Sequence, residues 1–150
     1  MEAILVPIDF SDVTRDVVVE ALRLASRLGG RIVLLHVLRP PGLSGMPEAQ
    51  FTELAPMIES MRGAAGAALE RWRAFVARTY RDVQTLQADG YPAREIARLT
   101  RTLRARYVVV GAHGHSGIYS LLVGTTTSGV LSQSRVPVVV VRSPRRKSRR

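Results

Sequence analysis

The sequence predicts an α/β protein in which helices cover both faces of a doubly wound, five-stranded parallel sheet. Two observations predict this fold. Five segments of strand length alternate with four segments of helical periodicity, an order that is typical of parallel sheets with right-handed crossovers. Most of the strand segments are apolar throughout, as expected when both faces of a sheet are covered.

The five expected strands are short, and prolines, glycines or polar residues mark their ends. They comprise residues 3–8, 31–37, 82–88, 107–111 and 136–141. The segment 82–88 alternates polar and apolar residues with period two, which predicts a half-exposed edge strand. If the segment 136–141 also lies at an edge, pairing with a second copy of the chain is the natural cover for its valines. An internal position for this strand is the alternative.

The four expected helices have apolar stripes at helical spacing and recognisable start or stop residues. They are the segment between Ser11 and Gly29, residues 52–78, the segment that begins at Pro92, and residues 125–134. Ser11 is expected to cap the first helix through its hydroxyl, and Gly29-Gly30 is expected to end it. The expected buried stripes include Leu28, Met57 and Met61.

The composition predicts one ordinary globular domain of 150 residues, with 46% hydrophobic and 23% charged residues. No cysteine is present, which excludes disulfides, thiol catalysis and cysteine-ligated metals. The acidic Glu2 and a short apolar start differ from a signal peptide, and no apolar run approaches the length of a membrane span. We therefore expect a soluble, cytoplasmic protein without a membrane span.

The formal net charge of +10 is concentrated at the end of the chain. Five of the last six residues are basic, namely Arg145, Arg146, Lys147, Arg149 and Arg150. Residues 1–142 are therefore expected to form the domain and residues 143–150 a disordered basic tail. Such a tail can bind nucleic acid or anionic membranes through counterion release, or can simply aid solubility, and the second interpretation is favoured.

A doubly wound sheet binds ligands at the carboxyl ends of its strands, where the strand order reverses. Gly111 and Gly114 follow a buried strand at such an end, and Gly124 precedes the last helix. Glycines let a ligand approach the backbone closely, and an open helix start presents free N–H groups. Hydroxyl donors follow at once, from Thr125, Thr126 and Thr127. The pattern predicts a cradle for an anion, most often a phosphate.

Familiar catalytic and phosphate motifs do not fit the chain. Gly124 lacks the lysine of a Walker loop, and the first strand lacks the G-x-G-x-x-G spacing. No positioned general base, arginine finger or nucleophile is evident, so no catalytic residue is expected and a slow Mg²⁺-dependent ATPase is the enzymatic alternative. His113 and His115 lack a third metal ligand nearby. Two simpler interpretations stay open: the glycines serve a tight turn, and Asp9 only helps to cap a helix.

The spacing Gly111-x2-Gly114-x9-Gly124-Thr125 resembles the nucleotide-binding signature of the universal stress protein family, G-x2-G-x9-G-Ser/Thr. Four strand segments are also similar to that family. They are ILVPIDFSD, IVLLHV, YVVVGAHGHSGI and VPVVVVR. Together these matches extend in order over residues 2–142.

The resemblance implies an ATP-binding protein with strand order 3-2-1-4-5 that acts in stress response or signalling as a nucleotide-dependent homodimer, paired through the Val136–Val141 strand. It places Asp9 against the nucleoside and the backbone of Val37 against adenine. The expected ligand-binding set is Pro7, Asp9, Val37, Gly111, Gly114, Gly124, Thr125, Thr126 and Thr127, and Mg²⁺ can accompany the nucleotide. ATP is expected to order the loop 38–50 and the glycine-rich loop, which changes the surface offered to a partner.

Overall fold

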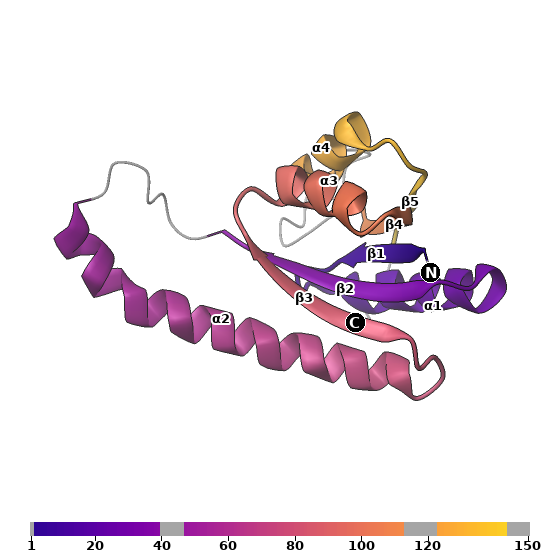
Figure 1. Ribbon diagram of the computed structural model, residues 1–150, viewed down its shortest axis with the longest axis horizontal. Coiled ribbons are helices and arrows are strands. Elements are labelled where there is room, and N and C mark those ends of the chain that lie inside the picture. Colours follow the sequence, from indigo (N-terminus) through magenta and orange to yellow (C-terminus); the bar gives the residue numbers. More distant parts are fainter. Residues whose placement is uncertain (1, 40–46, 113–122, 144–150) are drawn as a thin grey trace, which may run out of the picture.

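The computed structural model contains one parallel sheet with the strand order β3-β2-β1-β4-β5 (Figure 1). It describes residues 2–39, 47–112 and 123–143. The strands are β1 (Ala3–Pro7), β2 (Arg31–Leu38), β3 (Val83–Asp89), β4 (Ala105–Gly111) and β5 (Val138–Val141). The helices are α1 (Thr14–Leu28), α2 (Glu48–Ala77), α3 (Pro92–Thr102) and α4 (Thr125–Gln133). The predicted fold class and strand order are confirmed.

The sheet lies between two helical layers because successive side chains of each strand point to opposite faces. Ile4 and Val6 of β1 pack in a core with α1 and α2, whereas Leu5 packs in a second core with α3 and α4. Figure 1 shows the two pairs of helices on opposite sides of the sheet. The crossovers through α1 and α2 lie on one face, and those through α3 and α4 lie on the other. The chain therefore leaves β1 and β4 toward opposite faces, and this separation opens the carboxyl edge of the sheet beside β1.

The start of α1 differs from the prediction. The helix begins at Thr14 after Val13, without a side-chain cap, so Ser11 does not cap it as expected. The Ser11 hydroxyl instead donates to Asp9 Oδ1 at 2.6 Å, because a tight turn brings the two side chains together. The carbonyl of Ser11 accepts the Thr14 N–H at 3.0 Å. The capping role therefore falls to the backbone of this turn.

The end of α1 follows the prediction, since Gly29 and Gly30 adopt positive φ values of 72° and 104°. A Cβ at Gly30 would also lie 2.8 Å from the Glu2 carbonyl oxygen, so glycine is required there on both grounds. Leu28, which was expected on the buried stripe, is 44% exposed because it lies in the last turn, just before the chain leaves for β2.

Helix α2 is longer than predicted and begins at Glu48 rather than residue 52. Its buried residues Ile58, Ala65, Leu69 and Val76 recur at helical spacing and face the sheet. The first turns of α2 extend past the end of the sheet in Figure 1. Met57 and Met61, predicted to be buried, are therefore 44% and 41% exposed. None of the helices in the described ranges has the length and hydropathy needed to span a membrane.

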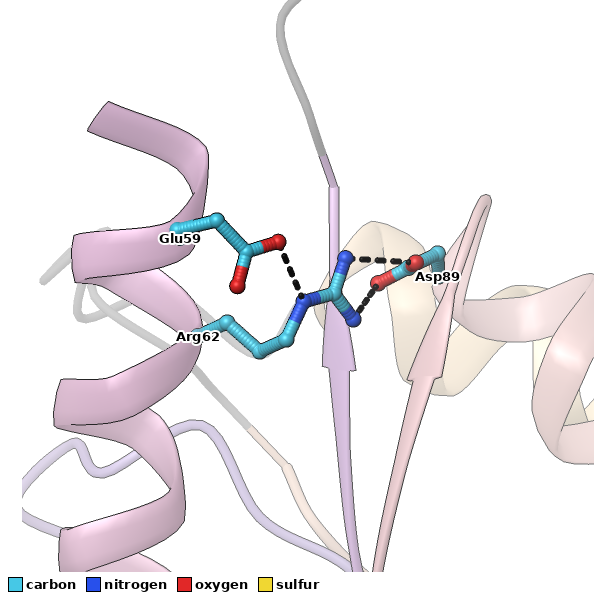
Figure 2. A network of polar contacts seen from close by, with 3 residues as sticks. All are labelled: Glu59, Arg62 and Asp89. Atoms are coloured by element: carbon cyan, nitrogen blue, oxygen red, sulfur yellow. Dashed lines mark hydrogen bonds and ion pairs between the residues drawn. The ribbon is translucent and has the colours of Figure 1, made fainter. Parts of the chain in front are cut away.

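Two polar contacts fix α2 against the edge strand β3. The Arg62 guanidinium donates two parallel hydrogen bonds to the Asp89 carboxylate, at 3.1 and 3.0 Å, and lies 3.5 Å from Glu59 (Figure 2). These bonds to Asp89 raise the pKa of Arg62. Nearer the other end of the strand, Glu70 accepts hydrogen bonds from Arg73 at 2.7 Å and Thr85 at 2.9 Å.

The hydrogen bonds that Glu70 accepts, from Arg73 first and Thr85 second, lower its pKa below the ordinary value of 4.5. Ionised Glu70 therefore contributes stability at neutral pH, and this contribution is lost as the pH falls through the lowered pKa. We predict that Arg73→Gln raises the pKa of Glu70 toward the ordinary value. Carboxyl-carbon NMR titration of both proteins measures the shift, and equal midpoints would contradict the assignment.

Candidate functional site

A cavity of about 260 Å³ opens at the carboxyl edge of the sheet, beside the central strand β1. The ends of β1, β2 and β4 contribute to its walls, and so do the first turns of α1, α3 and α4. Strand ends and helix starts meet here because every strand of the sheet is parallel. The cavity therefore lies where the sequence placed the candidate site.

The end of β1 carries Asp9 in a fixed orientation. Its Oδ1 atom accepts hydrogen bonds from the Ser11 N–H at 3.0 Å and from the Ser11 hydroxyl at 2.6 Å. Between them, Phe10 has a φ of 62°, a left-handed conformation that non-glycine residues rarely adopt. Strain of this kind, at a cost of about 1–3 kcal/mol, is typical of functional turns. The turn holds the Asp9 carboxylate at the cavity wall.

The end of β2 is joined to this turn through His36. Its Nδ1 atom lies 2.9 Å from the Ile8 carbonyl oxygen, and its ring stacks on Phe10 with centroids 4.5 Å apart. A carbonyl oxygen can only accept, so Nδ1 carries the proton. These contacts show that His36 is packed and hydrogen-bonded at the end of β2. They also stabilise the strained Phe10 and orient the neighbouring Val37, which lines the cavity.

The start of α4 is anchored to the end of β4 by two hydrogen bonds. The Gly124 N–H donates to the Ala112 carbonyl at 2.9 Å, and the buried Thr127 hydroxyl donates to the Gly111 carbonyl at 2.6 Å. The first N–H groups of a helix have no acceptor within the helix, and among the described residues the amides of residues 125–127 have none outside it either. Gly124 has a φ of −59°, which any residue adopts, so its backbone does not require glycine.

The polar and apolar parts of the cavity have different origins. Ile8, Val13, Val17 and Ile96 supply apolar walls from both layers. In the lining that the structure describes there is no lysine or arginine, and Asp9 is the one carboxylate. Positive potential at the α4 end therefore comes from backbone amides and the helix dipole rather than from charged side chains.

Eight of the nine predicted site residues line this one cavity. They are Pro7, Asp9, Val37, Gly111, Gly124, Thr125, Thr126 and Thr127. The ninth, Gly114, falls outside the described residues, as do His113, His115 and most of the two loops expected to order around ATP. Ligand binding by these residues stays a prediction.

Sequence reasoning missed the contributions of α1 and α3. Thr14 lines the cavity and is 2% exposed, and its buried hydroxyl oxygen has no hydrogen-bond partner in the described part of the chain. Pro92 and Ile96 bring the start of α3 into the wall. The position of these residues in the fold could have indicated them, because any helix that follows a parallel strand begins at this edge of the sheet.

We predict that Thr127→Val lowers the free energy of unfolding by about 1–2 kcal/mol, because it removes a buried hydrogen bond while keeping the side-chain volume. Urea denaturation followed by circular dichroism measures the change. Thr126→Val, at an exposed position of the same turn, serves as the control and should change stability by less than about 0.5 kcal/mol. Equal losses in the two variants would show that the Thr127–Gly111 bond does not stabilise the start of α4.

Comparison with protein families gives a match over almost the whole domain. The model described as "Universal stress protein family" matches residues 1–142. A universal stress protein of Methanocaldococcus jannaschii is 24% identical over 143 residues, which cover 95% of this chain and 83% of the relative. One from Mycobacterium tuberculosis is 31% identical over 147 residues, or 93% of this chain and 45% of the relative. The chain thus spans less than half of the mycobacterial relative.

Solved structures share the fold. The universal stress protein UspA from Lactobacillus plantarum has a TM-score of 0.85 and 26% identity, with 94% of this chain and 97% of that chain covered. A universal stress protein in complex with cAMP has a TM-score of 0.71 and 22% identity, with 95% and 98% covered. One from Archaeoglobus fulgidus in complex with dAMP has a TM-score of 0.66 and 17% identity, with 93% and 97% covered. At these lower identities the likeness concerns the fold alone.

Proposed function

The chain belongs to the universal stress protein family, and from this premise we propose that it binds an adenine nucleotide, ATP in the first place, in the cavity beside β1. The observation that carries the proposal is the cavity itself, which brings together eight residues predicted from the sequence as one nucleotide site. The complexes of structural neighbours with cAMP and dAMP support the choice of adenine, since both ligands contain that base.

The apolar part of the cavity suits the base. A planar, apolar ring fits between aliphatic walls such as Ile8, Val13 and Ile96, and the backbone of Val37 at the end of β2 offers hydrogen bonds to its edge. Asp9, held by Ser11, is placed to accept a hydrogen bond from the nucleoside. Pro7 forms the adjoining wall at the end of β1. The nucleoside would therefore occupy the end of the cavity nearer β1 and β2.

The start of α4 suits the phosphates. Its free amides, Gly111 and the Thr125 and Thr126 hydroxyls would surround the phosphate oxygens, as helix starts do in many phosphate sites. The Thr127 hydroxyl is already bonded to Gly111, so we assign Thr127 a backbone contact only. A triphosphate beside Asp9 needs further positive charge, which Mg²⁺ can supply with one carboxylate, the phosphates and water as ligands. The Gly114 contact is proposed from its spacing alone.

We predict that Gly124→Val weakens ATP binding at least tenfold, because its methyl groups would lie where phosphate oxygens approach the helix start. The backbone at Gly124 is compatible with valine, so the fold should survive. Isothermal titration calorimetry with ATP and Mg²⁺ measures the affinity. Gly63→Val, on the exposed face of α2 where a Cβ meets no atom within 4 Å, is the matched control.

Mass spectrometry of the protein released from its expression host provides an independent check of the ligand. We expect an adenine nucleotide with the wild type and none with Gly124→Val. Full-strength ATP binding by Gly124→Val, or no adenine-nucleotide binding at millimolar concentrations by the folded wild type, would overturn the proposed function.

We further propose that the protein acts in the cytoplasm as a nucleotide-dependent homodimer in stress response or signalling, paired through the segment 136–141. Strand β5 lies at an edge of the sheet, next to β4, which supports this assignment over the internal position. Its four valines are half-buried. An apolar edge strand is a site of unwanted pairing unless a partner covers it.

Substitution of Val140 tests the dimer. Pro137 and Val141 carbonyls bond to β4, so by alternation the N–H of Val140 points toward the free edge. We predict that Val140→Pro leaves the fold intact and converts a dimer to a monomer, as measured by circular dichroism and sedimentation equilibrium. Val139→Pro, whose N–H belongs to the β4 ladder, should unfold more easily. A monomeric wild type at tens of micromolar, or a dimeric Val140→Pro, would contradict the proposal.

A further inference from the structure

A second pocket, of about 190 Å³, lies at the edge of the sheet opposite the nucleotide cavity. It is formed where α3 leads into β4 and α4 leads into β5, so it lies at the amino ends of these strands. Three arginines line it: Arg101 in the last turn of α3, Arg104 between α3 and β4, and Arg135 between α4 and β5. The length of β4, at about 3.3 Å per residue, separates the two pockets by roughly 20 Å. A single nucleotide cannot reach from one to the other.

These three arginines have no acidic partner among the described residues. In the part of the chain that the structure describes, none of them forms an ion pair, and the described lining of the pocket contains no carboxylate. Arg98, one turn before Arg101, differs because Glu95 lies 2.8 Å from it. Residues 96–150 contain eleven basic residues and no acidic one. The local sequence therefore offers no carboxylate to neutralise the pocket.

The position of Arg104 adds a second observation. It has a φ of 49°, a left-handed conformation just after the end of α3 where glycine is the usual residue. The partial negative charge at a helix end favours a cation, and one arginine at the end of α3 and one at the end of α4 would satisfy it. The three arginines are solvent-exposed residues that line one pocket, and together they leave an excess of positive charge there, which a bound anion would relieve.

We propose that this arginine pocket is an anion site for a compact phosphate group, separate from the nucleotide cavity. Guanidinium groups bind phosphate oxygens through two parallel hydrogen bonds, a geometry that lysine does not provide. A concave pocket fits one phosphate group, whereas a nucleic-acid backbone needs an extended basic surface. The ligand is inorganic phosphate or a phosphate monoester on a small molecule. The site does not depend on the proposed nucleotide binding.

Titration with inorganic phosphate at constant ionic strength tests the site, with amide NMR of the full chain as the readout. We expect saturable shifts at Arg101, Arg104 and Arg135. Arg101→Gln and Arg135→Gln should each weaken phosphate binding about tenfold, as loss of a charged hydrogen bond implies. Arg27→Gln removes an exposed arginine from the last turn of α1 and should change binding less than twofold. Equal weakening by Arg27→Gln would overturn the proposal.

Arg104→Gly removes the charge while relieving the left-handed strain, so lost binding in this variant cannot result from unfolding. The Gly124→Val variant distinguishes the two sites. Amide shifts that phosphate still causes in this variant support the arginine pocket, whether or not the variant has lost ATP binding. Shifts that vanish with Gly124→Val would place the phosphate in the nucleotide cavity and overturn the inference. Titrations with glucose 6-phosphate, a small phosphate monoester, and with a single-stranded DNA 20-mer compare the two other classes of phosphate ligand. Saturation by DNA alone would also overturn it.

Discussion

The parallel pairing of β1 with β2 on one side and β4 on the other is the constraint on which the rest of the molecule depends. These ladders place three strand ends at one edge, and the crossovers from β1 and β4 go to opposite faces. The crevice between them therefore results from the strand order and the crossovers, whatever the side chains are. Buried residues such as Leu5 and Val6, fully inaccessible to solvent, keep β1 in place and thereby keep the crevice open.

In the proposed nucleotide site, backbone groups would replace the charged side chains of other anion sites. The described lining of the main cavity has no arginine or lysine, and the amides at the start of α4 take their place. Their direction depends on two short hydrogen bonds that tie α4 to Gly111 and Ala112. The opposite edge shows the reverse arrangement, with Arg101, Arg104 and Arg135 around a pocket that offers no acidic side chain. The two edges of one sheet thus carry pockets of different composition, one lined by the start of α4 and the other by arginines.

Local patterns were enough to predict the elements and the edge that holds the site, because alternation and periodicity are properties of short segments. They were not enough where a distant contact decides the outcome. Ser11 is a residue type that often caps helices, but here its hydroxyl donates to Asp9. Met57 and Met61 lie on the expected apolar stripe of the helix, but they are exposed because this part of α2 extends past the end of the sheet. Thr14 lines the cavity, although no sequence motif predicted this position. Spacing predicted the glycines and threonines of the candidate site, but only the structure shows the Thr127 bond to Gly111.

The bond between the Ala112 carbonyl and the Gly124 amide has an evolutionary consequence. It fixes both ends of the intervening stretch at one point, so the stretch can change length or sequence without moving the sheet or α4. Doubling the length of such a closed stretch costs only about 0.6 kcal/mol in chain entropy. An insertion at this point would therefore lengthen the connection while the scaffold beneath stays as it is.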